Sequence, residues 1–172
     1  MTGRHGWQSW DAYQRTHESN LERLPTFITQ DLLTIEVGDR FVDWSGRIEL
    51  AGGIEFAVVL QQQVRYRRDG RPEVRTRRYK YQAMVTVAGR KRGILRYDNS
   101  HARPEHPDDH HKHVRGPSGR AVVVHIGEAN SPTLWDVIAE LEKWVQTGEV
   151  ARLKGMLARH PLAEGQNDDF TT

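Results

Sequence analysis

Cysteine is absent from the chain of 172 residues. Disulfide bonds and thiolate chemistry are therefore excluded, and a chain without cysteine is typical of a reducing compartment. Long apolar runs are absent too, because no stretch approaches the ~20 apolar residues that a membrane helix needs. No apolar run of signal-peptide length follows the first six residues. We therefore expect a cytoplasmic protein that does not associate with a membrane.

Negative charge is scarce in the middle of the chain. Residues 65–96 contain 12 lysines and arginines but 2 acidic residues and carry +10, whereas residues 1–64 and 97–172 each carry −4. Most of the cations are arginines, which bind phosphate with a forked geometry. Such a local field attracts phosphates and indicates a nucleic-acid partner. The alternative is a pair of solvated strands whose charge is balanced by acidic neighbours in the fold.

Apolar residues make up 37% of the chain, and the mean hydropathy is −0.73, so we expect a small hydrophobic core and a very polar surface. Between Leu32 and about Val87 apolar and polar residues alternate, which predicts β-strands. Gly52-Gly53 and Asp69-Gly70 predict turns between them, and Gly89 and Gly93 flank a basic turn. Shorter strands are predicted at residues 94–97 and 121–126. Consecutive hairpins favour an antiparallel meander of about five to six strands.

Helical spacing of apolar residues is found at both ends of the chain. Residues 9–24 predict a helix that Ser9 caps and Pro25 ends. A second helix is predicted to open at Ser131-Pro132 and to stop at Gly148, with one apolar face that would cover the sheet. A weaker helix is predicted from Glu149 to Arg159.

These elements together predict an α+β fold, in which an antiparallel β-sheet meander packs against a C-terminal helix. We expect an N-terminal helical extension at residues 1–30 and an α+β core domain at residues 31–148. A short C-terminal helix and a flexible tail are expected at residues 149–172.

Five of the nine histidines lie between His101 and His113, in a segment without regular periodicity. Histidine exchanges a proton near neutral pH and can act as general acid or base in phosphodiester cleavage. RNA supplies its own nucleophile, the 2′-hydroxyl, so such a site needs no metal. A carboxylate at the preceding strand end can orient an imidazole. The candidate catalytic residues are His111, His113, His110, His101 and Asp98.

Arginine side chains can hold the scissile phosphate and stabilise its developing charge. The basic block runs in sequence directly into the histidine cluster, which is why we assign phosphate binding to it. The candidate nucleic-acid-binding residues are Arg96, Arg75, Arg77, Arg78, Lys80, Arg90 and Arg92.

Two other interpretations of the histidine cluster stay open. Its imidazoles and Asp98 are enough for a three- or four-ligand metal site, although their spacing matches no strong zinc signature. The other interpretation is that the segment is a solvated loop in which the histidines have no function. His125 lies within an apolar strand and is interpreted as a structural histidine, and Tyr97 as a core residue.

The sequence Arg96-Tyr97-Asp98-Asn99, followed by His111-Lys112-His113 and by a helix with Trp135 and Glu140, resembles the TumE family of prokaryotic toxins. The resemblance extends over roughly residues 41–145, and its specific part is the two short motifs. It implies antiparallel strands, a closing helix and a role as the toxin of a type II toxin–antitoxin module. The resemblance supports the role as a toxin more firmly than it supports any particular reaction. The chain departs from the family in its N-terminal extension and in a longer, acidic loop at residues 105–109.

Our leading hypothesis is a toxin that acts on RNA as a metal-independent endoribonuclease without a cofactor. Its partners would be RNA and a cognate antitoxin protein, and a homo-oligomer stays open. The alternatives are a non-enzymatic regulator that binds nucleic acid or a nucleoprotein, and a metal-dependent nuclease.

Overall fold

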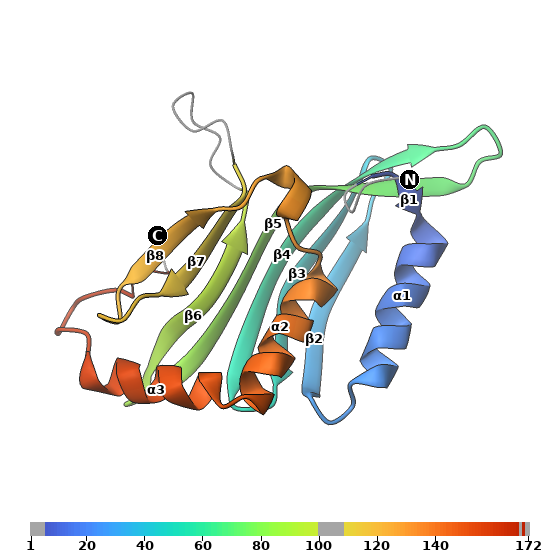
Figure 1. The fold of residues 1–172 in the computed structure, drawn as a ribbon. Coiled ribbons are helices and arrows are strands. Elements are labelled where there is room, and N and C mark those ends of the chain that lie inside the picture. The colour runs from blue at the N-terminus through green and yellow to red at the C-terminus, as the bar shows by residue number, and fades with distance from the viewer. Residues whose placement is uncertain (1–5, 100–108, 169, 171–172) are drawn as a thin grey trace.

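An antiparallel sheet of eight strands forms the centre of the protein (Figure 1). The computed structural model describes residues 6–99, 109–168 and 170. The strands are β1 (Gln8–Ser9), β2 (Ile28–Val37), β3 (Phe41–Leu50), β4 (Ile54–Tyr66), β5 (Pro72–Val87), β6 (Arg90–Asp98), β7 (His111–Arg115) and β8 (Ala121–His125). Strands β2 to β8 pair in sequence order, and β1 pairs with β5. The sheet is therefore a meander, as predicted.

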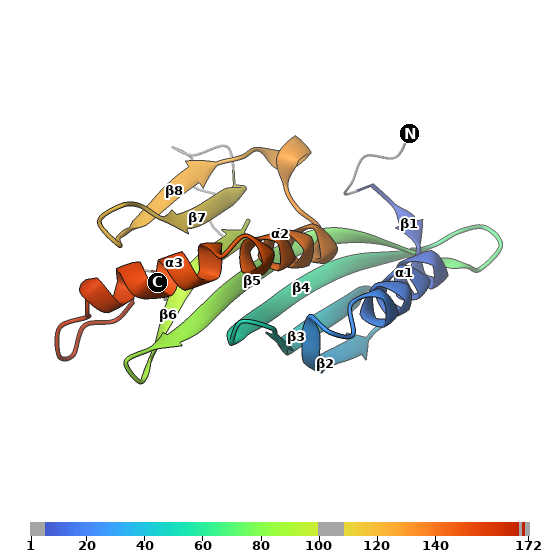
Figure 2. The same ribbon diagram turned by 60° about the horizontal axis from the view of Figure 1, so that its bottom comes forward.

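Three helices lie over one face of this sheet (Figures 1 and 2). They are α1 (Trp10–Arg23), α2 (Leu134–Gln146) and α3 (Glu149–Arg159), and a short 3-10 turn, η1 (Glu128–Asn130), precedes α2. The β7–β8 end of the sheet curls toward the helices (Figure 2). None of the three helices covers the opposite face, which we call the helix-free face.

The core lies between the sheet and the helices. In β4 the side chains of Phe56, Val58 and Leu60 alternate toward this side and are fully buried. Helix α2 packs onto them with an apolar stripe that includes Ile138 and Leu141. Helix α1 also contributes to the core, because Trp10 packs edge-on against Trp44 of β3.

The predicted α+β fold is confirmed, with more strands than expected. The two additional strands are β1 and β7. Strand β7 reads His-Lys-His-Val-Arg and has one apolar side chain, so it lacks the alternation that identifies a strand in sequence. Pairing to β6 on one side and β8 on the other holds it in the sheet.

Two local predictions are corrected by the structure. Gly93 lies inside β6 and does not flank a turn, because β6 runs without interruption from Arg90 to Asp98. Helix α2 begins after Thr133, not at Ser131, because the Thr133 hydroxyl accepts a hydrogen bond from the Asp136 N–H. The Asp136 carboxylate accepts one from the Thr133 N–H in return, which completes a capping box.

Candidate functional site

The pairing of β6 with β7 brings the two sequence motifs together. Asp98 lies opposite His111 and Arg96 lies opposite His113 in the antiparallel ladder. Directly opposed residues share a face of the sheet. Because Tyr97 and Lys112 reach Glu140 of α2 on the other face, the two histidines and the two charged residues lie on the helix-free face.

Asp98 is the centre of this cluster and is fully buried. Its Oδ2 accepts a hydrogen bond of 2.7 Å from Nε of Arg96 and lies 3.4 Å from Nε2 of His113. A buried carboxylate of this kind fixes the orientation of an imidazole and stabilises its protonated form. The orienting role that the sequence predicts for Asp98 stays a prediction, and this contact with His113 is the geometry on which it depends.

His111 lies between His113 and a third histidine, His125 of β8. The ring centroids of His111 and His125 are 4.7 Å apart, and those of His111 and His113 are 6.3 Å apart. We interpreted His125 as structural, but its side chain is exposed and joins the cluster. No sequence signal places it there, since the contact depends on the register between β7 and β8.

Two cations extend the cluster onto β5. Lys80 lies opposite Asp98, and Arg78 lies two residues earlier on the same face. Arg78 is exposed and Lys80 is half-buried. Burial lowers the pKa of the Lys80 ammonium and the nearby Arg96 guanidinium lowers it further, whereas Asp98 acts in the opposite direction.

Two predicted phosphate-binding arginines are buried in ion pairs. Arg96 is bound to Asp98, and Nε of Arg92 donates a hydrogen bond of 2.7 Å to Asp168. Arg90 is exposed, and its guanidinium donates to the backbone carbonyls of Leu162 and Ala163.

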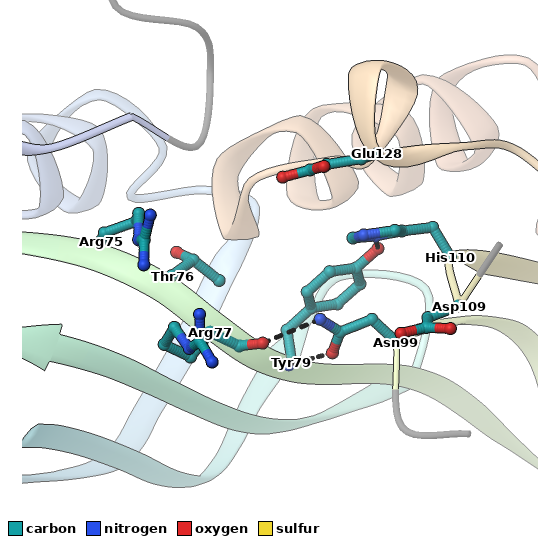
Figure 3. Close-up of a pocket in the computed structure, with 8 residues that line it drawn as sticks. All are labelled: Arg75, Thr76, Arg77, Tyr79, Asn99, Asp109, His110 and Glu128. Carbon is teal, nitrogen blue, oxygen red and sulfur yellow. Dashed lines mark hydrogen bonds between the residues drawn. The ribbon is translucent and has the colours of Figure 1, made fainter. Parts of the chain in front are cut away.

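A separate cleft of about 290 Å³ is lined by three more of the predicted site residues, Arg75, Arg77 and His110 (Figure 3). Arg75 and Arg77 lie at one end and His110 at the other, with Tyr79 between them (Figure 3). The Tyr79 hydroxyl and Nδ1 of His110 are 2.9 Å apart and share a hydrogen bond. The carboxylate of Glu128 also lines this cleft. The structure thus separates His110 from His111 and His113.

Asn99 closes the sheet beside the cleft. Its side-chain carbonyl accepts a hydrogen bond from the Tyr79 N–H, and its amide group donates one to the Arg77 carbonyl. The side chain therefore takes the place of a neighbouring strand on this part of β5. His101 lies outside the described residues.

Within residues 6–99, 109–168 and 170, no three histidine or carboxylate side chains are arranged to hold a metal ion. Within the same ranges, no helix has the length and apolar character to span a membrane.

Comparison with known proteins identifies a family for this chain. The family model described as Toxin TumE matches residues 21–147, which is well over half of the chain. No curated protein matches the sequence, and no solved structure matches the fold.

Proposed function

The chain belongs to the TumE toxin family, and from this premise we propose that it acts on RNA as a metal-independent endoribonuclease. The family makes it the toxin of a toxin–antitoxin system and implies a cognate antitoxin as its partner. The reaction is our inference from the residues on the helix-free face.

One observation carries the proposal: a carboxylate–imidazole pair, Asp98 and His113, lies beside a second imidazole, His111, on a face that no helix covers. Two imidazoles on one face can divide the work of base and acid between them. The His113 side chain is 16% exposed, whereas His111 is buried, so the proposal requires His111 to become accessible when RNA binds. We assign the base to His113, because Asp98 orients it.

In the proposed reaction, the nucleophile is the 2′-hydroxyl group of the RNA itself. His113 takes the proton of a 2′-hydroxyl while the 2′-oxygen forms a bond to phosphorus. The bond between phosphorus and the 5′-oxygen breaks, and His111 gives its proton to that leaving oxygen. The products are a 2′,3′-cyclic phosphate and a free 5′-hydroxyl, and no metal takes part.

Phosphate binding is assigned to two cations on the same face as the histidines, the exposed Arg78 and the half-buried Lys80. Lys80 lies opposite Asp98 in the ladder. Arg96 is buried against Asp98, so we assign it the role of holding that carboxylate in place. Arg75 and Arg77 lie in the cleft, where they can bind the same RNA strand further along.

The test is cleavage of a mixed RNA pool by purified protein in the presence of a chelator. We expect His113→Ala and His111→Ala each to lower the cleavage rate by about 100-fold or more, the usual contribution of a general base or acid. Arg152→Gln is the control, because it removes an exposed basic side chain of α3 that lines neither cleft and should leave the rate unchanged.

Three outcomes would contradict parts of this proposal. If His110→Ala abolishes cleavage and the other two variants do not, catalysis belongs to the cleft with Tyr79. Loss of activity in chelator would indicate a metal-dependent nuclease. A protein that is toxic in cells but leaves RNA intact would be a binding regulator.

The antitoxin is expected to cover the helix-free face. This face holds both imidazoles and the two cations, so a partner bound there excludes RNA. Charge removal at Arg78 and Lys80 should then weaken the binding of RNA and of the antitoxin together.

A further inference from the structure

The end of the chain returns to the helix-free face next to the histidines. Asp168 and Phe170 are both buried there, although they follow a stretch without helix or strand. Segments of this kind are usually exposed, since they bury little apolar surface of their own. Their burial indicates that the sheet offers a specific place for a carboxylate and an aromatic ring.

The Asp168 carboxylate lies between two arginines. Its Oδ2 accepts a hydrogen bond of 2.7 Å from Arg92, and its Oδ1 accepts one of 2.5 Å from Arg115. Burial alone would raise the pKa of Asp168, but the Phe170 N–H and the two arginines outweigh it and hold the pKa below its ordinary value. Two convergent guanidinium groups are also what binds a phosphate group in proteins.

The Phe170 ring packs against Arg115, the same arginine that binds Asp168. The Arg115 guanidinium lies over the ring, 4.2 Å from its centroid, and the His113 ring lies 6.2 Å away. A side chain at Gly93 would overlap the phenyl ring, so glycine keeps this part of β6 open for it. The Phe170 carbonyl accepts hydrogen bonds from Gln82 and Arg96.

Among the described residues, arginines outnumber carboxylates around the Asp168 side chain. A cleft of about 560 Å³ beside the tail is lined by Arg92, Arg115, Arg120 and Arg159. Asp168 pairs with the first two. Within the described ranges, Arg120 and Arg159 form neither a side-chain hydrogen bond nor an ion pair, so the cleft keeps cationic groups available to an anion.

We propose that Arg92, Arg115 and the surface over Gly93 form a nucleotide-binding subsite that the protein's own tail fills. The Asp168 carboxylate takes the place of a phosphate, and the Phe170 ring takes the place of a base stacked on Arg115. The inference deepens the proposed function, because the subsite adjoins His113. RNA enters it by displacing the tail, so the tail competes with the substrate.

The test is an NMR titration of the full chain with adenosine monophosphate and, separately, with adenosine. We expect Asp168→Asn to tighten the binding of the monophosphate about tenfold, because a tethered competitor of effectively millimolar concentration is weakened. Adenosine, which has no phosphate, should bind as it does to the unchanged protein.

Phe170→Ala is the second variant, and it changes no charge. It should tighten the binding of both ligands, because it vacates the place of the base. Glu149→Gln is the matched control: it also removes a carboxylate paired with an arginine, Arg152, but at the N-terminal end of α3, whereas the tail follows the C-terminal end. Its affinity for the monophosphate should equal that of the unchanged protein.

The proposal is overturned if Asp168→Asn and Phe170→Ala only lower the melting temperature and leave both affinities unchanged. It is also overturned if Glu149→Gln gives the same gain, since net charge would then explain it. The titration measures binding, not cleavage. A phosphate-dependent gain in a protein that cleaves no RNA would therefore reject the ribonuclease and retain the subsite.

Discussion

At the scale of single residues, the predicted arginines are divided by how far they are buried. Arg77 and Arg78 are exposed, Arg75 is half-buried and donates to Gln63, and Arg92 and Arg96 are buried against carboxylates. The sequence shows only that arginines are dense in this block. Their division depends on Asp98 and on Asp168, which is distant in the chain, so composition could not reveal it.

Asp168 should make stability depend on pH. Its pKa is lowered in the folded protein, so its contribution is complete above the unfolded value of about 3.9 and is lost as the pH falls below that value. We expect Asp168→Asn to lower the unfolding free energy by about 1.5–3 kcal/mol near neutral pH. The difference should shrink in acid. Urea unfolding between about pH 3 and pH 7 checks this, and a constant difference would contradict it.

At the scale of elements, the strands with apolar alternation were predictable and the histidine strand was not. Residues 54–66 and 72–87 alternate clearly, and Gly52-Gly53 fixes the hairpin between β3 and β4. Strand β7 takes its structure from its neighbours, so its register and the contact of His111 with His125 were not accessible from local pattern. The sequence predicts that the carboxylate at the strand end can orient an imidazole, whereas the residue pairs between the two motifs required the ladder.

The start of α2 offers a test of how that helix is held. Thr133→Ala removes the hydroxyl that accepts from the Asp136 N–H and should lower the unfolding free energy by about 1 kcal/mol. Thr147→Ala is the control at the other end of the same helix, where the hydroxyl donates to the Lys143 carbonyl and is exposed. We expect the control to change stability by less than about 0.5 kcal/mol. Equal effects in urea unfolding would argue against the cap.

At the scale of the whole molecule, the sheet separates two tasks. One face buries the core under three helices (Figures 1 and 2). The other face carries the paired residues Lys80, Asp98 and His111, with Arg78 and His113 beside them. An open, charged face binds a polyanion mainly through its phosphates, and such binding weakens as salt rises. Under the proposed function, the cations on this face would therefore matter more for RNA binding than the small net charge of +2.

Salt dependence measures how many phosphates this face neutralises. Replacing both Arg78 and Lys80 by glutamine should lower the slope of log affinity against log salt by about 1.4, or 0.7 for each lost contact with single-stranded RNA. Arg152→Gln, an exposed change on α3, should leave the slope unchanged. Fluorescence anisotropy between about 50 and 200 mM salt gives both values. An unchanged slope in the double variant would place the RNA elsewhere.

The hydrogen bonds of the Asn99 side chain also mark a point at which an insertion into the chain can be designed. It satisfies the backbone of β5 before residues 100–108 begin, and the Ile126 N–H donates to the His110 carbonyl after they end. Because Asn99 and His110 each form hydrogen bonds with described residues outside this segment, we expect the register of β6 and β7 to tolerate an insertion between them. For protein engineering this is a grafting point, where an inserted epitope or a fluorescent label would report on events at the adjacent histidines.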